Sequence, residues 1–369
     1  MTIKTDFKTF GFVGLGLIGG SIAHALREHL PSCRIVVYDI DSKTRRLSLS
    51  SGVATEAVDK IDEAFSQCDC IFLCAPVSDN GHNLSLLKNV AKSSCLLTDV
   101  GSVKAPIHQK VKELQLENRF IGGHPMAGSE RFGFINSKSL LLQNAYYILT
   151  PCSDVPAETV LAFRNLIKSI GAIPLLTDAQ KHDMITGAIS HLPHVISASL
   201  VNLIKSEDTP DAMMKTVAAG GFKDITRISS SSPVMWQQIC LTNRENIVFL
   251  LDHYIQSLLN VKKIIENSEE NKILDFFKEA QEYRDSFADV SSGPIKKAYA
   301  IHVEIADQPG ALSSVATLLA QNGISIKNIG ITHNRERTDG ALRIEFYQEE
   351  SLKQANELLL REGYLTHQP

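Results

Sequence analysis

Phe12-Val13-Gly14-Leu15-Gly16-Leu17-Ile18-Gly19-Gly20-Ser21 is the stretch of sequence that decides the fold. An apolar run turns at glycines and passes into a helical pattern. Gly14, Gly16 and Gly19 have the spacing G-x-G-x-x-G, which joins a strand to a helix and binds the pyrophosphate of a dinucleotide. We expect Gly14 to permit the tight turn, Gly16 to let the backbone approach the pyrophosphate, and Gly19 to let the helix pack on the strand.

An acidic residue follows this turn at the distance that a dinucleotide site requires. The second predicted strand, 33–38, ends in Asp39, whose carboxylate is an acceptor for the ribose hydroxyls. Its charge repels a 2′-phosphate and so favours NAD over NADP, a preference that the nearby Arg45 and Arg46 could soften. The predicted NAD contacts are Gly14, Leu15, Gly16, Leu17, Ile18, Gly19, Asp39, Ala75, Pro76, Val77 and Asp99.

Length and composition limit the class of protein. A chain of 369 residues is expected to form two or three domains. The net charge of -4 gives no reason to expect nucleic acid or an acidic membrane surface as a partner. The 7 cysteines show neither a disulfide framework nor paired metal motifs. Because we also find no signal-peptide pattern and no long apolar span, we expect a cytoplasmic protein without a membrane partner.

The first part of the chain has the pattern of a doubly wound α/β sheet. Short apolar strands, at 33–38, 70–74, 95–100 and 119–122, alternate with helical patterns. Segments 145–150 and 172–176 are predicted edge or extension strands, with a helix at about 156–170 between them. We therefore predict a Rossmann-type dinucleotide-binding domain over residues 1–177.

Two further domains are expected. Residues 178–290 contain no convincing strand and are predicted to be all-helical. One helix carries an apolar seam, either an internal core or a subunit interface, and we favour dimerisation: Ile247, Leu251, Tyr254, Leu258, Val261 and Ile265. A linker at 291–297 precedes a small α+β module, 298–369, whose order βαββα, with a possible last strand at 364–365, is ferredoxin-like.

Polar residues follow two strands of the predicted sheet. Ser102 comes after the strand at 95–100, and His124 after the strand at 119–122. In a doubly wound sheet, ligands bind beyond the carboxyl ends of the strands. A histidine accepts a proton near neutral pH, as the oxidation of an alcohol requires. We predict that His124 is the base and that Ser102 orients it or holds the substrate hydroxyl.

The predicted helical domain adds a second polar cluster. His191 and His194 are spaced i, i+3, but no carboxylate or thiol has matching spacing, so we do not predict a metal site. Lys223 and Arg227 are spaced i, i+4 and suit the capture of a substrate carboxylate. Asp224 lies between them, and Trp236, the only tryptophan, lies nearby in sequence.

These motifs together resemble the prephenate dehydrogenase family. The stretches at 14–21, 99–104, 122–130, 190–194 and 220–227 occur in the family's order. The last module resembles an ACT domain, an amino-acid-sensing fold. Its stretch 307–312 matches the usual ligand-binding loop of that domain, and 322–326 matches the entry to the next strand.

The resemblance implies NAD-dependent oxidative decarboxylation of prephenate to 4-hydroxyphenylpyruvate, in tyrosine biosynthesis. His124 would take the proton of the C4 hydroxyl, Ser102 would orient His124, and Arg227 would bind a substrate carboxylate. The further pocket residues implied are Lys223, Asp224, Glu130, His191, His194 and Trp236. The helical domain of one subunit would complete the site of the other in a homodimer.

The resemblance also implies regulation and leaves rivals open. Tyrosine, the end product, is the expected effector, with its carboxylate on the N–H groups of a helix start. The expected effector contacts are Asp307, Pro309, Gly310, Ala311, Leu312 and Asn322. Rival interpretations are an arogenate dehydrogenase, a general β-hydroxyacid dehydrogenase, and a sensor of NAD and amino acids without turnover.

Overall fold

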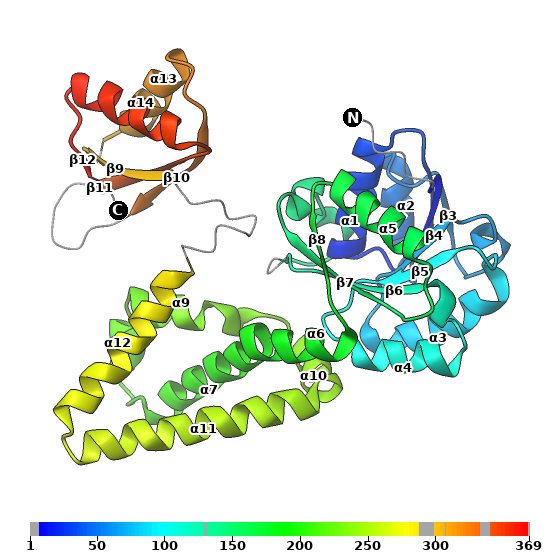
Figure 1. Cartoon of the computed structure of the whole chain (residues 1–369), viewed down its shortest axis with the longest axis horizontal. Coiled ribbons are helices and arrows are strands. Elements are labelled where there is room, and N and C mark those ends of the chain that lie inside the picture. The colour runs from blue at the N-terminus through cyan, green and yellow to red at the C-terminus, as the bar shows by residue number, and fades with distance from the viewer. Residues whose placement is uncertain (1–6, 129–130, 288–298, 307, 333–339, 368–369) are drawn as a thin grey trace. The chain divides into compact units, whose positions relative to one another are not determined.

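The computed structural model describes the chain except residues 1–6, 129–130, 288–298, 307, 333–339 and 368–369 (Figure 1). The chain divides into two compact units, residues 1–262 and residues 263–369. The predicted linker at 291–297 falls outside the described residues.

A mixed sheet of eight strands forms the centre of the first unit, in the order β3-β2-β1-β4-β5-β6-β7-β8. All neighbouring strands pair in parallel except β6 and β7, which are antiparallel. The predicted extension strands therefore exist, but they run against the rest of the sheet. The strands are β1 (Thr9–Val13), β2 (Arg34–Tyr38), β3 (Glu56–Val58), β4 (Cys70–Leu73), β5 (Leu96–Asp99), β6 (Phe120–Pro125), β7 (Tyr146–Pro151) and β8 (Ile173–Leu176).

Helices cover both faces of this sheet (Figure 1). One apolar core contains buried residues of α1 and α5, such as Ile22 and Phe163, and the other contains those of α3 and α4, such as Leu84 and Ile107. Because the strand order reverses between β1 and β4, the carboxyl ends of these strands form the crevice where such sheets bind ligands. The helices are α1 (Leu17–His29), α2 (Ser42–Ser50), α3 (Val77–Val90), α4 (Ala105–Glu113) and α5 (Ala157–Ser169).

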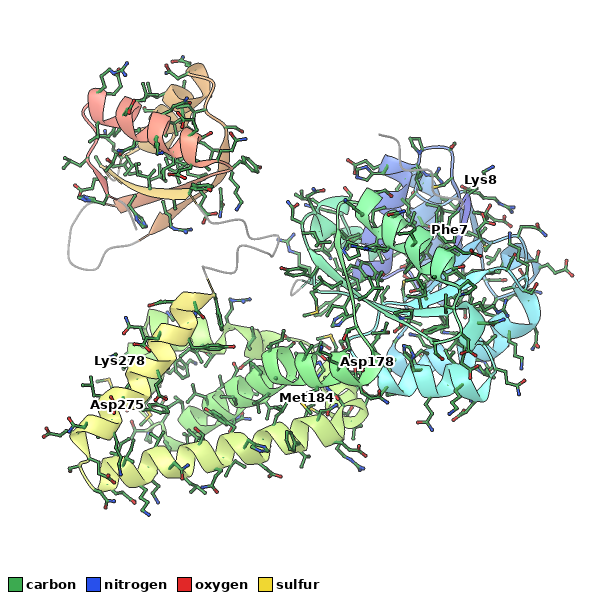
Figure 2. The ribbon with its side chains drawn as sticks, in the orientation of Figure 1. Phe7, Lys8, Asp178, Met184, Asp275 and Lys278 are labelled. Carbon is green, nitrogen blue, oxygen red and sulfur yellow. The ribbon has the colours of Figure 1, made fainter. Side chains whose placement is uncertain are left out.

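The described residues between 178 and 287 contain helices and no strand, as predicted. Asp178 caps the first of them, since its side chain accepts a hydrogen bond from the backbone N–H of Lys181 at 2.8 Å (Figure 2). The helices are α6 (Ala179–Thr186), α7 (Leu192–Glu207), α8 (Met213–Val217), α9 (Gly220–Thr226), α10 (Pro233–Thr242), α11 (Arg244–Glu266) and α12 (Glu270–Ser286).

Helix α6 continues through a π-helical turn, Gly187–His191, into α7. The resulting helix of 29 residues is long and apolar enough to cross a membrane, which corrects the expectation that no long apolar span exists. Pro193 interrupts the helical pattern, so the sequence alone does not indicate one helix of this length. His182, Asp183 and His191 are buried and hydrogen-bonded within the first unit, although only 22% of the apolar window of this helix is buried.

Helix α11 carries the predicted apolar seam, whose exposure increases along the helix. Ile247 is buried in the core of the first unit. Leu258 and Ile265, farther along the same seam, are 49% and 56% exposed. Leu251, Tyr254 and Val261 are half-buried, so a single chain leaves part of this seam uncovered.

A four-stranded antiparallel sheet, in the order β10-β11-β9-β12, forms the end of the chain. Val303, Leu342 and Ile344 of the sheet pack against Val315 and Leu359 of the helices. The elements are β9 (Tyr299–Ile305), α13 (Ala311–Gln321), β10 (Ile326–Thr332), β11 (Gly340–Phe346), α14 (Glu349–Arg361) and β12 (Thr366–His367). The last strand lies two residues later than the predicted 364–365.

Candidate active site

The glycine turn between β1 and α1 has the geometry that its sequence predicts. Gly14 has φ +85°, and a Cβ there would lie 2.7 Å from the backbone nitrogen of Ala75. A Cβ at Gly19 would lie 2.8 Å from the Cβ of Cys74, so Gly19 is the point where the helix packs on the strand. A Cβ at Gly16 would meet no heavy atom within 4 Å. The structure therefore leaves open space beside Gly16, at the N-terminus of α1, where an anion is favoured.

Asp39 lies against the same turn. Its Oδ2 accepts a hydrogen bond from the backbone N–H of Leu15 at 2.7 Å, and its Oδ1 accepts one from that of Asp41 at 2.8 Å. Arg45 donates to the backbone oxygens of Asp39 and Ile40, at 2.5 and 3.2 Å. The acidic residue and the glycine turn thus meet at one place, as a dinucleotide site requires.

The segment 75–77 lies at the other side of this crevice. Ala75 comes two residues after the end of β4, and its backbone lies beside Gly14. Pro76 immediately precedes α3, which begins at Val77. Leu17 and Ile18 begin α1. The residues predicted to bind NAD at 14–19, 39 and 75–77 are therefore grouped around the carboxyl ends of β1, β2 and β4.

Asp99, also a predicted NAD contact, is buried in an ion pair that sequence reasoning missed. Its Oδ2 contacts the Nζ of Lys104, and the two side chains are 2% and 0% exposed. Oδ2 also accepts from the backbone N–H of Gly101 at 2.9 Å, and Oδ1 accepts from that of Gly123 at 3.2 Å. The Nζ of Lys104 donates to the backbone oxygen of Gly123 at 2.7 Å. The pair therefore joins the turn after β5, at Gly101, to β6 at Gly123, the residue before His124.

Opposing effects act on the pKa of this lysine. Desolvation lowers the pKa of Lys104, while the carboxylates of Asp99 and Asp183 act in the opposite direction. The side chain of Lys104 is fully enclosed, so it belongs to the protein interior rather than to an open pocket.

His124 lies within β6, which extends past the predicted end at residue 122 because β7 pairs with it, opposite Ile148. Its Nδ1 is 2.8 Å from the Nε2 of His182. Ser102, in the turn between β5 and α4, forms no hydrogen bond with the His124 ring in the described part of the chain. The structure thus gives His124 a partner different from the one predicted. Burial lowers the pKa of His124 well below its usual range, and the nearby His182, Lys104 and His191 lower it further.

The partner of His124 is itself held by a buried carboxylate. Nδ1 of His182 lies 2.7 Å from Oδ1 of Asp183. The backbone N–H of Lys104 donates to Oδ1 of Asp183, and that of Ala105 to Oδ2, each at 2.7 Å. Since α4 begins at Ala105 without a capping side chain of its own, Asp183 caps this helix from α6.

His191 and His194 surround Trp236. The ring of His194 stacks on that of Trp236 with centroids 3.7 Å apart, and the ring of His191 meets it edge-on at 6.0 Å. Nδ2 of Asn243 lies 2.9 Å from Nδ1 of His191 and donates to the backbone oxygen of Asp183 at 2.8 Å. Burial lowers the pKa of His191 to about 4. The Nε1 of Trp236 is buried without a hydrogen-bond partner among the described residues.

Lys223, Asp224 and Arg227 lie on α9 and the short helical turn that follows it, and all are exposed in the single chain. The charge of Arg227 acts on His194, whose pKa is lowered mainly by burial and to a smaller degree by this guanidinium. Contacts therefore lead from His124 through His182, Asp183, Asn243 and His191 to Trp236 and His194. Glu130 lies outside the described residues.

The described effector residues lie in the loop before α13, in the first turn of α13 and at the end of this helix. Gly310 has φ +94° and precedes α13, which begins at Ala311, while Asn322 ends this helix. Asp307 lies outside the described residues. A cavity of about 410 Å³ on the same helix is lined by other residues, namely Ser313, Ser314, Thr317, Leu318, Gln321, Glu362 and Tyr364.

Models of two protein domains match most of the first 279 residues. The model described as "Prephenate dehydrogenase, nucleotide-binding domain" matches residues 22–175, and the one described as "Prephenate dehydrogenase, dimerization domain" matches residues 178–279. A prephenate dehydrogenase of Bacillus subtilis (strain 168) is 35% identical over 356 residues, which is 95% of each chain.

The chain belongs to the prephenate dehydrogenase family.

Solved structures agree with this assignment. The prephenate dehydrogenase of Aquifex aeolicus, in complex with hydroxyphenyl propionate and NAD+, has a TM-score of 0.73 and 30% sequence identity, and the match covers 77% of this chain and 100% of that one. The arogenate dehydrogenase of Synechocystis has a TM-score of 0.68 and 27% identity, over 76% of this chain and 99% of that one. The chain is an NAD-dependent dehydrogenase, and its glycine turn, open space at Gly16 and Asp39 fit this cofactor.

Proposed function

We propose that the chain catalyses the NAD-dependent oxidative decarboxylation of prephenate to 4-hydroxyphenylpyruvate, a step of tyrosine biosynthesis. The observation that carries this proposal is His124, a neutral histidine held by a buried partner near the carboxyl end of the sheet, in a chain 35% identical to a prephenate dehydrogenase. Such a histidine is available as a proton acceptor at neutral pH.

The cofactor belongs in the crevice between β1 and β4. Gly14 to Gly19 and the N-terminus of α1 would hold the pyrophosphate, and Asp39 the adenosine ribose. When bound, NAD+ supplies the acceptor for the hydride that leaves C4 of the substrate. The buried Asp99 and Lys104 support the loop beside this crevice.

His124 would take the proton of the C4 hydroxyl group while that carbon is oxidised. Loss of CO2 from the ring then yields an aromatic product, and aromatisation drives the step. The hydroxyl of Ser102 would contact the substrate or the cofactor, since in this structure it does not hold the His124 ring.

Substrate carboxylates would be bound by the cluster in the helical domain. An Arg227 guanidinium matches a carboxylate in geometry and charge. The buried Nε1–H of Trp236 has no partner among the described residues, so a substrate oxygen would satisfy it. Lys223, Asp224, Glu130, His191 and His194 complete the proposed pocket.

We further propose that two chains form a homodimer in which the helical domain of one subunit completes the site of the other. The exposed apolar seam of α11 and the match to a dimerization-domain model support this proposal.

The proposed domains are residues 1–177, 178–290 and 298–369. We place the enzyme in the cytoplasm.

Arogenate is the main alternative substrate, and it carries an amino group where prephenate has a keto group. The similarity to the arogenate dehydrogenase of Synechocystis, at 27% identity, keeps this alternative open. The absorbance of NADH distinguishes the candidates when the enzyme is given prephenate, arogenate and a simple 3-hydroxy acid in turn. Turnover with prephenate at the highest kcat/KM is expected, and absence of turnover with all three would refute the proposal. His124→Asn should abolish turnover but retain NAD binding.

The C-terminal module is proposed to be an ACT domain of ferredoxin-like fold that binds tyrosine and inhibits the enzyme. Its βαββαβ order and antiparallel sheet support this fold.

Ala311→Asp would place a carboxylate at the start of α13, where it suits the helix but repels the carboxylate of tyrosine. We expect tyrosine inhibition to weaken by about tenfold or more, without loss of basal activity. Lys353→Asp, on the exposed face of α14, is the control. Unchanged inhibition in Ala311→Asp would refute the assigned loop.

A further inference from the structure

Two histidine rings and a carboxylate form a chain of hydrogen bonds inside the first unit. Nδ1 of His124 lies 2.8 Å from Nε2 of His182, and Nδ1 of His182 lies 2.7 Å from Oδ1 of Asp183. His182 and Asp183 are 0% and 1% exposed, so water does not compete for these bonds.

Asp183 is fixed as an acceptor. Besides His182, it receives the backbone N–H groups of Lys104 and Ala105, each at 2.7 Å. Each oxygen of this carboxylate already accepts a backbone N–H, so each presents a lone pair to any further partner. Its Oδ1 must therefore meet an N–H, and not a lone pair, on the ring of His182.

The positions of the protons follow in order from this carboxylate. When the ring of His182 carries a single hydrogen and that hydrogen is on Nδ1, its Nε2 has a lone pair. This lone pair accepts a hydrogen bond, so Nδ1 of His124 must carry a hydrogen. In a neutral ring, Nε2 of His124 then has the lone pair.

We propose that His182 and Asp183 are positioning residues that hold His124 in the tautomer whose Nε2 accepts the proton of the substrate. This inference rests on the proposed role of His124 as the base. It adds two residues that act through His124, in the way that an aspartate orients the histidine of a serine protease.

The chain of hydrogen bonds orients a proton but does not conduct it onward. As the C4 carbon loses its hydride, the O–H bond breaks, its electron pair forms the C=O bond, and the proton joins Nε2 of His124. The positive imidazolium that results is stabilised through His182 by the charge of Asp183. After CO2 leaves, its bonding electrons pass into the ring and the phenolate oxygen can recover the proton from Nε2. Because the proton returns to the product from Nε2, no proton needs to leave through His182 and Asp183, which are fully enclosed.

Two substitutions at His182 separate an orienting role from a packing role. His182→Gln can place a carbonyl oxygen near the position of Nε2 and so keep an acceptor for His124, whereas His182→Phe fills the space without one. We expect His182→Phe to lower kcat by about 100-fold or more, and His182→Gln by about tenfold or less. KM for prephenate and for NAD+ should change by less than about threefold in both variants. His108→Gln is the control, because that histidine is partly buried but bonds to Thr150 and Cys152 instead.

Retention of kcat in His182→Phe, or equal losses in the Gln and Phe variants, would overturn the inference. Asp183 is less suitable for substitution, because it also caps α4.

A second measurement does not depend on turnover. In the full-length protein labelled with 15N-histidine, the ring-nitrogen shifts of His124, assigned by comparison with His124→Asn, should show a hydrogen on Nδ1 and none on Nε2. A hydrogen on Nε2 would overturn the inference even if the enzyme oxidises prephenate. If the enzyme oxidises none of the tested substrates, the proposed function fails, but the spectrum still decides the tautomer.

Discussion

Replacement of Lys104 by methionine tests whether the buried ion pair with Asp99 is a structural requirement. Methionine retains most of the apolar stem but removes the ammonium group. The substitution leaves the carboxylate of Asp99, 2% exposed, without its cationic partner. It also removes the hydrogen bond from Nζ to the backbone oxygen of Gly123.

The expected loss of stability is large because both groups are enclosed. Breaking a buried ion pair by removal of one partner costs about 3–5 kcal/mol, since the remaining charge stays desolvated. Asp99 retains two backbone donors, Gly101 and Gly123, which places the expected cost toward the lower end of that range. Lys104→Met with Asp99→Asn should cost about 2 kcal/mol less than the two single changes added together, because the double variant buries no charge there.

Urea unfolding followed by the fluorescence of Trp236 measures these costs. This residue is the only tryptophan and packs on the cluster that contains Val103, next to Lys104. Lys110→Met in α4 is the control, because its pair with Glu113 is exposed and worth about 1 kcal/mol or less. A loss below about 1 kcal/mol in Lys104→Met would refute the assignment of the pair as a structural element.

Three further predictions concern the cofactor, the pH and the substrate. Gly16→Ala should leave the unfolding midpoint nearly unchanged but raise KM for NAD+ by about tenfold. Gly14→Ala should instead destabilise the fold, because of these two positions only Gly14 would place its Cβ against protein atoms. Equal effects of the two variants in both assays would contradict this account. The pKa of His191 is about 4 in the folded chain and 6.5 in the unfolded chain, so the unfolded state binds this proton first as the pH falls. This contribution to stability is complete well above pH 6.5 and is reduced by about 2 kcal/mol at pH 5. Urea unfolding at pH 7.5 and pH 5 should show that His191→Gln loses less stability on acidification than the unaltered chain. Arg227→Lys should raise KM for prephenate by about tenfold with a smaller effect on kcat, and initial-rate kinetics would exclude the proposed carboxylate contact if KM stayed constant.

Local chemistry made the first part of the fold predictable. The turn at Gly14 needs a positive φ, and alternating apolar strands and helices identify a doubly wound sheet before any coordinate is known. Most predicted strands agree with the structure within one or two residues. The strand β3 was missed because its three residues, Glu56–Val58, are too few to show a pattern. The antiparallel direction of β7 was missed because it depends on how the chain crosses the sheet, which no local pattern records.

The candidate site was only partly predictable for the same reason. His124 attracted attention because it follows a strand and a pair of glycines. Its partner His182 is 58 residues away in the chain, on a helix whose orientation toward the sheet depends on tertiary packing. Lys104 was part of a noted motif, but an ordinary lysine is expected at the surface. The adjacent pair His182-Asp183 was the one available signal, and by itself it is a weak one.

The π-helical turn at Gly187–His191 has a consequence for the alignment of the whole pocket. Along a regular α-helix, residues 182 and 191 would point about 180° apart, because each residue advances by about 100°. The wider turn, closed by the hydrogen bond from Leu192 N–H to the Gly187 oxygen, changes this phase, and Asn243 bridges the Asp183 backbone and the His191 ring. One surplus residue thus sets the rotational register between the part of the helix that serves the dinucleotide half and the part that faces Trp236. Removal of one residue from this turn would restore a regular α-helix with the same phase, whereas removal of one residue from the regular part between His182 and Gly187 would rotate the two parts by about 100° relative to each other.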